Sequence, residues 1–471
     1  MKETTLKILL FTTPAGLAKG QVEKPSFGIQ PLGILYLASA LNKWADFEYS
    51  VKVVDTYTFG HGSNDIKNII TDFKPNVVGV SAVTILIHDA QYICSLAKDI
   101  SPEILTVIGG PHASTIPTDA VQHKDTDIAV IGEGEIIFLE LCRTVYNQEE
   151  YQSISGIAYK NNGHIIVNDK IPPIDNLDEI PFPNLSLVPD LEYYNPMPHW
   201  GKSGHFSTMV TSRGCPYDCS FCSVTVDQGQ KYRYRSPENI IEEIKDLRKK
   251  YMITEVSFRD GTFTTNKKRV EGLCNLMIKE KLNVEWSCNV RANELDPELL
   301  RLMKKAGCNF VFYGIEQGNS ELLWKHKKLR KEKVRTAARW VREAGMDVQG
   351  YFIMGMPEEN MSTLQETIDF AKSLPLNSAV FTILSPFPGT KVYDYCKRQE
   401  LLLGLGWDQF DARARLAWKH PNLTEKQLVK MMKKAYRSFY VRPSIIMDRL
   451  KHIKSWRDVV NHFRLALSFL K

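Results

Sequence analysis

Short apolar runs alternate with helical stretches along the first 150 residues, and this alternation limits the fold of the chain more than any other feature. The runs are nearly all apolar, which predicts strands that are buried on both faces. We expect these strands at Leu6–Phe11, Ser50–Val54, Val77–Ser81, Leu105–Ile108 and Ile128–Ile131. Helices are expected between them, at Pro31–Trp44, Asp65–Phe73, His88–Asp99 and Glu135–Tyr146. The order predicts a doubly wound, parallel α/β domain over residues 1–150.

A hairpin signal and a proline-rich segment follow this domain. Ser153–Tyr159 and His164–Asn168 flank a turn that contains Asn162 and Gly163, which predicts two antiparallel strands. Residues 170–198 carry seven of the 23 prolines of the chain. Proline lacks the N–H that a helix interior needs, so an extended linker is expected here. We place the hairpin and linker at 151–205, with a domain boundary inside this region.

The same alternation returns over residues 206–395. Strands are expected at Phe206–Thr211, Glu255–Phe258, Val284–Ser287, Phe310–Tyr313, Asp347–Met354 and Ala379–Leu384. Helices are expected at Pro237–Tyr251, Lys267–Lys281, Asp296–Ala306, Lys331–Ala344 and Thr363–Leu374. Six strand–helix units predict a partial (β/α)6 barrel, followed by a helical region over 396–471. Active sites of such barrels lie at the C-terminal ends of the strands, which is where we look for functional residues.

Three cysteines stand within eight residues directly after the first of these strands. Cys215, Cys219 and Cys222 have the spacing CxxxCxxC. Three thiolates on one loop can bind three irons of a 4Fe–4S cluster and leave the fourth iron open. A structural zinc site is the main alternative, but it needs four protein ligands in paired spacing, and no second pair stands nearby.

The stretch Thr211–Cys222 resembles the cluster loop of the radical S-adenosylmethionine (SAM) enzymes. The resemblance implies that the three cysteines bind the cluster and that the amino and carboxylate groups of SAM chelate the open iron. An electron from the cluster then breaks a carbon–sulfur bond and releases a 5′-deoxyadenosyl radical. Phe221 belongs to the same loop.

Four later strand ends resemble motifs by which this family binds SAM. Asp260 lies in an F-x-D-x-x-F-like element, and its alternative role is to cap the following helix. Arg291 follows the third strand, where it binds the SAM carboxylate or forms a salt bridge. Glu316 resembles the family's ribose-binding acid, although Gln317 follows it where serine is more common. The turn after the fifth strand resembles the element that flanks adenine, through Gly355, Met356 and Pro357, and ends at Glu358. No catalytic residue is assigned beyond the cluster.

The first domain resembles the cobalamin-binding domain that precedes many radical SAM cores. The matching positions follow the third, fourth and fifth strands and are Ser81, Thr84, Gly109, Gly110, Gly132 and Glu133. One departure is that the second strand ends at Asp55 without the histidine of the motif D-x-H-x-x-G. Cobalamin then binds without a protein histidine, or the glycines only make tight turns and the domain binds something else. His112 is expected near the pocket rather than on cobalt.

The remaining composition sets limits on compartment and partners. Net charge is +6, and nine cysteines at scattered spacings suggest a reducing compartment. No signal peptide is visible, and no apolar run approaches the roughly 20 residues that span a bilayer, so we expect a cytoplasmic protein. Cys94 and Cys142 cannot supply the second cluster of the related methylthiotransferases, so no nucleic-acid partner is expected.

The C-terminal tail carries the basic excess. Residues 425–471 hold twelve Lys/Arg against three Asp/Glu, a net charge of +9. Its helices either lie on an anionic membrane surface or pack on the barrel with a solvated basic face. Tyr436–Pro443 resembles a tail in the cobalamin-type group that includes the anaerobic cyclase of chlorophyll synthesis and hopanoid-modifying enzymes. A second basic stretch, Lys325–Arg342, is expected to be a solvated helix face.

These features predict a radical SAM enzyme with a 4Fe–4S cluster, SAM and cobalamin. Our first hypothesis is C-methylation of an unactivated carbon in a lipid or another secondary metabolite, with a flavodoxin or ferredoxin as reductant. The second is an oxidative cyclisation or rearrangement without methyl transfer. A third, from another class, is a non-catalytic cobalamin or cluster sensor.

Overall fold

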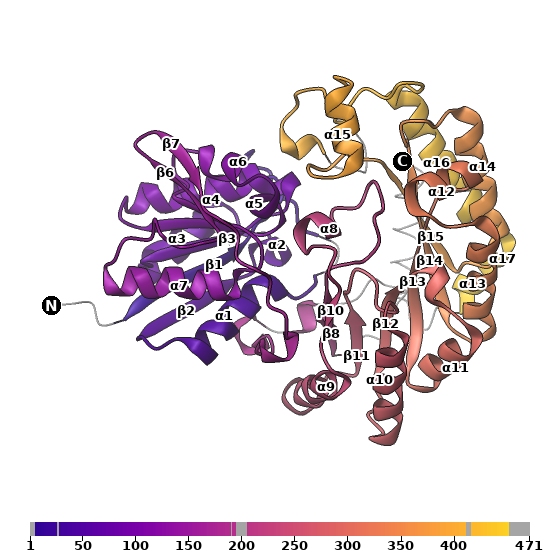
Figure 1. Ribbon diagram of the computed structural model, residues 1–471, viewed down its shortest axis with the longest axis horizontal. Coiled ribbons are helices and arrows are strands. Elements are labelled where there is room, and N and C mark those ends of the chain that lie inside the picture. The colour runs from indigo at the N-terminus through magenta and orange to yellow at the C-terminus, as the bar shows by residue number, and fades with distance from the viewer. Residues whose placement is uncertain (1–4, 26–27, 190, 195–204, 411–415, 452–471) are drawn as a thin grey trace. The chain divides into compact units, whose positions relative to one another are not determined.

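The computed structural model describes residues 5–25, 28–189, 191–194, 205–410 and 416–451 (Figure 1). The chain forms two compact units. Unit 1 consists of Met1–Tyr194 with the short segments Val226–Gln228 and Gly406–Asp408. Unit 2 consists of Asn195–Thr225, Gly229–Leu405 and Gln409–Lys471. No helix in the described part of the chain has the length and apolar content that crossing a bilayer requires.

Unit 1 is built on a seven-stranded sheet with the order β2-β1-β3-β4-β5-β6-β7. The first five strands pair in parallel, as the sequence predicts. They are β1 (Leu6–Thr12), β2 (Tyr49–Val54), β3 (Val77–Ser81), β4 (Leu105–Gly109) and β5 (Ile128–Val130). The strand order reverses between β1 and β3, and ligands of such sheets bind beyond the carboxyl ends of the strands at this point.

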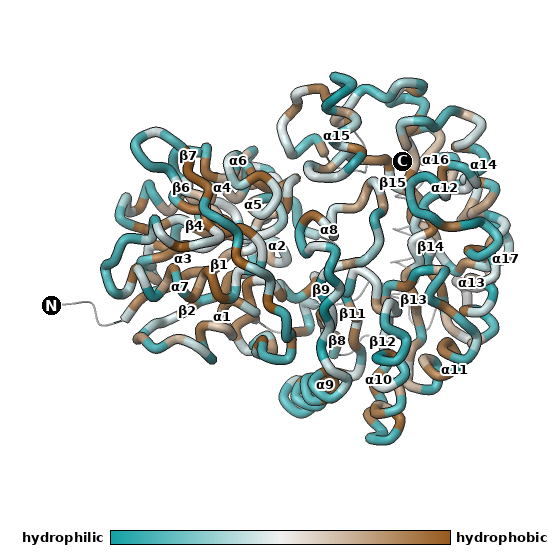
Figure 2. The backbone as a smooth tube through the Cα atoms, in the orientation of Figure 1, coloured by the Kyte–Doolittle hydropathy of each residue, from teal (hydrophilic) through white to brown (hydrophobic). Residues whose placement is uncertain are grey.

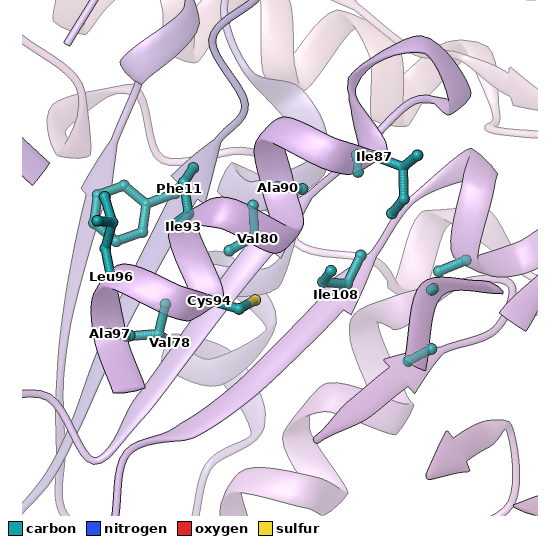
Figure 3. Close-up of a cluster of buried hydrophobic side chains, with 14 of the residues drawn as sticks. Phe11, Val78, Val80, Ile87, Ala90, Ile93, Cys94, Leu96, Ala97 and Ile108 are labelled. Carbon is teal, nitrogen blue, oxygen red and sulfur yellow. The ribbon is translucent and has the colours of Figure 1, made fainter. Parts of the chain in front are cut away.

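Helices complete the doubly wound architecture of unit 1. They are α1 (Leu32–Trp44), α2 (Thr56–Phe59), α3 (Ser63–Phe73), α4 (Ile87–Ile100), α5 (Pro111–Thr115), α6 (Pro117–Gln122) and α7 (Gly134–Asn147). Figure 3 shows one face of the sheet, where Phe11, Val78 and Val80 lie in one buried cluster with Ile87, Ala90 and Ile93 of α4. Figure 2 shows the apolar character of β1, which follows from its burial on both faces.

The predicted hairpin extends this sheet. β6 (Ile157–Asn161) and β7 (His164–Val167) pair antiparallel, and β6 also pairs antiparallel with β5. The proline-rich segment contains no α-helix in its described part, only the 3-10 turns Leu177–Glu179, Leu185–Leu187 and Leu191–Tyr193. It belongs to unit 1 as far as Tyr194, and Leu177 and Ile180 are buried against Tyr36. The segment therefore packs on the first domain.

Unit 2 contains a six-stranded parallel sheet with the order β15-β14-β13-β12-β11-β8, the partial barrel that the sequence predicts. Its strands are β8 (Phe206–Met209), β11 (Glu255–Phe258), β12 (Glu285–Val290), β13 (Cys308–Glu316), β14 (Asp347–Met354) and β15 (Ser378–Ile383). The crossover helices are α9 (Pro237–Tyr251), α10 (Lys267–Lys279), α11 (Pro297–Lys305), α12 (Ser320–Lys327), α13 (Lys331–Glu343) and α14 (Met361–Ser373). Smaller elements are β9 (Ser212–Arg213), β10 (Arg233–Tyr234), α8 (Val224–Asp227) and α15 (Lys391–Arg398).

The first tail helix covers the open edge of this sheet at β15. α16 (Glu425–Tyr440) buries Leu428, Met431, Ala435 and Phe439, which recur at helical spacing. The hydroxyl of Tyr436 accepts from the N–H of Phe381 at 3.1 Å and donates to its C=O at 3.0 Å. Tyr440 makes the same two bonds to Ala379, at 3.1 and 2.8 Å. α16 thus packs on the barrel, the second of the two roles expected for the tail helices.

A second tail helix, α17 (Pro443–Lys451), exposes 46% of Ile446 and 61% of Met447. The apolar positions further along the tail lie outside the described residues. The six cysteines away from the loop are buried thiols, as expected: Cys94, Cys142, Cys274, Cys288, Cys308 and Cys396.

Candidate functional site

The cysteine loop begins directly after β8 and is shaped by Gly214. Gly214 has φ +80°, and a Cβ there would lie 2.2 Å from the carbonyl oxygen of Lys231. Only glycine fits this close approach and this left-handed conformation. The N–H of Cys215 then donates to the carbonyl of Gly229 at 3.1 Å, which fixes the start of the loop.

The three thiols of the loop fit a cluster better than a single ion. Cys215, Cys219 and Cys222 are half-buried and free of disulfides. Among the described residues, no three His, Cys, Asp or Glu side chains converge as the ligands of one metal ion do. A structural zinc site needs four protein ligands, whereas three thiolates can hold a 4Fe–4S cluster because each binds a different iron. The donor set therefore fits the cluster with one iron left without a protein ligand.

Burial raises the pKa of the Cys222 thiol to about 11 and also raises that of Cys215. Metal coordination reverses this effect, because a coordinated thiol is deprotonated. The Arg291 guanidinium supplies a positive charge nearby, with Nη1 at 3.4 Å from Sγ of Cys219. This contact brings Arg291, predicted to bind the SAM carboxylate, to the cysteine loop.

Glu294 connects the cysteine loop to the barrel through hydrogen bonds. Tyr217 of the loop packs its ring against the Arg291 guanidinium, with Cζ 3.9 Å from the ring centroid. Its hydroxyl donates to Oε1 of Glu294 at 2.8 Å. Three threonine hydroxyls after β11 donate to the same carboxylate at 2.6 to 2.9 Å: Thr262, Thr264 and Thr265. Sequence reasoning missed Glu294, because no spacing marks a carboxylate whose partners come from two separate loops.

Asp260 lies fully buried beside the strand that leads into the loop. Its Oδ1 accepts from the N–H of Thr211 at 2.7 Å, and its Oδ2 accepts from the Thr211 hydroxyl. The Arg269 guanidinium also donates to this hydroxyl and lies 3.7 Å from the carboxylate. These contacts support a bracing role for Asp260, so its predicted bond to the SAM ammonium stays a prediction. The cap of α10 is Asn266 and not Asp260.

Glu316 ends β13 in a strained backbone conformation. It has φ +69°, which is uncommon for a residue other than glycine and often marks functional sites. Nζ of Lys327 donates to its Oε1 at 2.7 Å and to the carbonyl of Gly314 at 2.7 Å. Arg291 in turn donates to the carbonyl of Lys327. The structure thereby connects Cys219, Arg291 and Glu316 through Lys327.

His326 and Lys327 correct one expectation about the basic stretch Lys325–Arg342. Both side chains are buried, with 5% and 8% of the residue exposed. They lie on α12 and point to the site, so this part of the stretch is not a solvated helix face. No sequence signal marked this, because the two buried positions stand within a run of surface lysines and arginines.

The turn after β14 is held by a buried carboxylate next to the predicted one. Gly355 has φ +95°, and Met356 and Pro357 are buried. The N–H groups of Gly355 and Met356 both donate to Oε2 of Glu359. Burial raises the pKa of Glu359 to about 7, against the lowering effect of these donors. Glu359 therefore holds the turn through two backbone hydrogen bonds, whereas Glu358 is partly exposed. Phe221 is half-buried in the cysteine loop.

In unit 1, the predicted positions lie at the carboxyl ends of β3, β4 and β5. Gly110 has φ +97°, and a Cβ there would lie 2.9 Å from the carbonyl oxygen of Ala82. Gly132 has φ +87° and no atom within 4 Å of a built Cβ, so open space lies above this turn. The Ser114 hydroxyl joins the two turns, because it donates to the carbonyl of Gly110 at 3.0 Å and accepts from the N–H of Gly132 at 2.9 Å. This glycine cradle fits a large ligand such as cobalamin.

The four other predicted positions of this edge have different contacts. The Ser81 carbonyl accepts from Thr13 at 2.7 Å, which ties the end of β3 to the loop after β1. Thr84 begins a 3-10 turn, Thr84–Leu86, and its side chain is buried. Gly109 ends β4 beside them. The Glu133 carboxylate accepts from the N–H of Ile174 at 2.9 Å, so it binds the proline-rich segment.

Asp55 follows β2, at the place where the sequence lacks the histidine of the motif D-x-H-x-x-G. β2 is the edge strand of the sheet, and Asp55 at its end is buried. Asp55 accepts hydrogen bonds from Thr12 at 2.8 Å and from the hydroxyl of Tyr194 at 3.0 Å. The loop after β1 lies at the reversal of strand order and is the one that sequence reasoning overlooked. His112 is fully buried and its Nε2 lies 3.0 Å from Oδ2 of Asp119, and its expected position near a pocket stays a prediction.

Comparison with known proteins agrees with the fold expected for each of the two units. Residues 209–371 match the radical SAM superfamily, and residues 19–142 match the B12 binding domain. An uncharacterized methyltransferase of Pyrococcus horikoshii is 34% identical over 95% of this chain and 95% of its own. The anaerobic magnesium-protoporphyrin IX monomethyl ester cyclase of Rubrivivax gelatinosus is 30% identical over 77% of this chain and 65% of its own.

The solved structures give the same fold. The radical SAM methyltransferase TsrM from Kitasatospora setae, with cobalamin and a 4Fe–4S cluster bound, superposes with a TM-score of 0.73 at 18% identity. The match covers 93% of this chain and 92% of that chain. The order of domains and the relative at 34% identity together show that the chain belongs to the radical SAM superfamily, in the class that carries a B12 binding domain ahead of the radical SAM domain.

Proposed function

We propose that this enzyme is a cobalamin-dependent radical SAM C-methyltransferase. The observation that carries the proposal is the cysteine loop at the strand ends of a radical SAM domain, in one chain with a B12 binding domain. The relative that matches along nearly the whole chain is named a methyltransferase. When bound, the cluster and SAM supply the radical that removes hydrogen from carbon, and cobalamin supplies the methyl group.

The residues of unit 2 have separate tasks in this proposal. Cys215, Cys219 and Cys222 bind the cluster. Arg291 offers a charged donor beside Cys219, where the carboxylate of SAM would reach the open iron. Glu316 offers a carboxylate to the ribose hydroxyls, and Lys327 orients it. The Gly355 turn presents backbone groups to adenine on a support made by Glu359.

The residues of unit 1 bind cobalamin in this proposal without a protein histidine on cobalt. The open space above Gly132 and the left-handed Gly110 let the backbone approach the ligand closely. Ser81, Thr84 and Gly109 line the same edge. Glu133 contributes by ordering the segment that contains Ile174. The proposed functional division is 1–150 for cobalamin, 151–205 as hairpin and proline-rich linker, 206–395 for the radical SAM core and 396–471 as helical tail.

The test is isotope transfer from SAM. The protein is reconstituted anaerobically with cobalamin and a low-potential reductant. It is then incubated with SAM labelled in its methyl group and with an extract of cells that lack the enzyme's product. A methyltransferase transfers the label to one product and forms 5′-deoxyadenosine and S-adenosylhomocysteine together. Formation of 5′-deoxyadenosine with an unlabelled product would contradict methyl transfer.

An oxidative cyclisation or rearrangement is the second candidate. It is favoured by one observation, the 30% identity to the Rubrivivax cyclase. The product mass separates the two candidates, because methylation adds one methyl unit and cyclisation removes hydrogen. The non-catalytic sensor loses its support, since membership in the superfamily indicates an enzyme.

The substrate is a small molecule, and we infer that it is a lipid or another apolar secondary metabolite. The reductant is proposed to be a flavodoxin or ferredoxin, and the compartment the cytoplasm. Peripheral membrane contact is proposed for the tail after α16, where Ile446 and Met447 are exposed within a segment of net positive charge. Comparing the lipid fractions of strains with and without the protein would identify the substrate.

A further inference from the structure

His326 bonds two parts of unit 2 that are distant in sequence. It lies in the last turn of α12, and only 5% of the residue is exposed. Its ring nitrogen Nδ1 lies 2.7 Å from the hydroxyl of Ser220. Its Nε2 lies 2.9 Å from Oε2 of Glu358. The imidazole therefore has a polar partner on each side.

The chemistry of the partners sets the direction of these bonds. Burial raises the pKa of Glu358, but the hydrogen bonds from His326 and Lys325 outweigh it and bring the pKa to about 2. The carboxylate is thus ionised and can only accept, so Nε2 of His326 donates to it. In the neutral ring Nδ1 then accepts from the hydroxyl of Ser220.

Ser220 stands inside the cysteine loop, between Cys219 and Cys222. Besides the hydroxyl, its N–H donates to the carbonyl of His326 at 3.1 Å, and its carbonyl accepts from the N–H of Val392 at 3.0 Å. All three polar groups of Ser220 are therefore bound, two of them by His326. The position of the loop between these two cysteines depends on that histidine.

Glu358 stands in the turn after β14, directly after Pro357. The turn itself is held by Glu359. The chain Ser220–His326–Glu358 consequently connects the cysteine loop to the turn proposed to bind adenine. An imidazole suits this connection because it is rigid and forms hydrogen bonds at both nitrogens. A buried polar ring adds little stability over a well-packed apolar side chain, so stability alone does not account for a histidine at this position.

We propose that His326 is a positioning residue that keeps the cysteine loop in register with the Gly355–Glu358 turn, so that SAM bound at the turn meets the cluster bound at the loop. This inference rests on the proposed function of the site. In this proposal, Ser220 and Glu358 influence each other's effect on SAM binding through the ring of His326.

The experiment uses the full chain reconstituted with iron and sulfide. His326→Ala is compared with Ser220→Ala, with His326→Gln, and with Trp324→Ala as the control on the exposed face of the same helix. Three quantities are measured: iron content, the affinity for SAM, and the change that SAM causes in the electron paramagnetic resonance spectrum of the reduced cluster. For His326→Ala and Ser220→Ala we expect wild-type iron content, a roughly tenfold weaker affinity for SAM and a diminished spectral change.

Glutamine can donate and accept at similar separation, so His326→Gln should restore much of both losses. A double-mutant cycle makes the coupling explicit. The effects of Ser220→Ala and Glu358→Gln on SAM affinity should be non-additive when His326 is present and additive in the His326→Ala background.

Two outcomes would overturn the inference. One is wild-type SAM affinity and spectral change in both His326→Ala and Ser220→Ala. The other is additivity of Ser220→Ala and Glu358→Gln with His326 present. Failure of the proposed function looks different, because the wild-type protein itself would then bind no cluster or show no spectral response to SAM. If His326→Ala does not fold, Ser220→Ala, which removes one hydroxyl only, decides the question.

Discussion

Glu359 is a single residue on which the shape of the adenine-side turn depends. Its Oε2 accepts from two backbone N–H groups, whereas its Oε1 and Oε1 of Gln317 are buried without a hydrogen-bond partner among the described residues. Burial is the main cause of the raised pKa of this carboxyl, and the two backbone N–H donors oppose it.

The stability of the fold should therefore depend on pH through Glu359. Its pKa is about 7 in the folded chain and near 4.5 unfolded. Because the folded state binds the proton more tightly, this stabilisation is fully present below about pH 4.5 and is lost as pH rises to about 7. The loss amounts to about 3 kcal/mol at most.

Glu359→Gln is neutral at every pH and should remove this dependence. We expect the variant to match the wild type near pH 5 and to exceed its free energy of unfolding at pH 8, as measured by urea titration. Glu343→Gln, on the exposed side of α13, is the control. A variant that is less stable than the wild type at pH 8 would show that the ionised carboxylate stabilises the fold, which contradicts a raised pKa for Glu359.

Glu294 is the second residue whose contacts predict a large effect. Four hydroxyls donate to its two oxygens, and an amide offers only one oxygen in their place. Glu294→Gln should lower the free energy of unfolding by about 1–3 kcal/mol and loosen Tyr217 in the cysteine loop. Urea unfolding and the iron content after reconstitution measure the two effects. Unchanged values in both would mean that the network contributes nothing to the loop.

At the scale of elements, α16 replaces a seventh strand at the edge of the barrel sheet. An exposed edge strand offers unpaired N–H and C=O groups to other chains. Tyr436 and Tyr440 bind these groups at Phe381 and Ala379, two residues apart, where β15 points its backbone away from β14. The tail motif that resembles the cobalamin-type enzymes thus has a structural task in this chain.

Removing both hydroxyls tests this task. Tyr436→Phe with Tyr440→Phe should cost about 2 kcal/mol in the free energy of unfolding, since each change frees a donor and an acceptor of the edge strand. The double variant should also self-associate more, as seen by light scattering. Tyr251→Phe on α9 makes the same chemical change elsewhere. A double variant as stable and as monodisperse as Tyr251→Phe would contradict the account.

The turn after β5 is the element that most directly tests the cobalamin site. Gly132→Asn places a side chain into the open space above the sheet edge, and asparagine tolerates the left-handed conformation. Gly163→Asn is the matched control, because Gly163 also has a positive φ and open space, but in the hairpin between β6 and β7. We expect corrinoid affinity to fall at least about tenfold for Gly132→Asn only, measured by absorbance titration. Equal affinities in both variants would place cobalamin elsewhere.

At the scale of the whole molecule, the sequence predicted both α/β units and nearly every strand, because strands buried on two faces appear as short apolar runs. It also predicted the cysteine loop, since its ligands are close in sequence. Glu294, Lys327, His326 and Glu359 were missed for one shared reason. No motif or spacing in a single sequence marks their contacts, which for Glu294 and His326 are made with other strand ends and for Lys327 and Glu359 with groups of their own strand end. Motifs pointed to Asp260 and Glu133, but in the structure their carboxylates accept hydrogen bonds from the N–H groups of Thr211 and Ile174.

The central claim is that Cys215, Cys219 and Cys222 hold a cluster that cleaves SAM. The most direct measurement is 5′-deoxyadenosine formed by anaerobically reconstituted protein under reducing conditions, compared between the wild type and Cys219→Ala. The account predicts that the wild type forms 5′-deoxyadenosine and that the variant falls to background, whereas Cys396→Ala, which changes a buried thiol outside the loop, retains the activity. Cleavage of SAM by Cys219→Ala at the wild-type rate would contradict the assignment of the cluster to this loop.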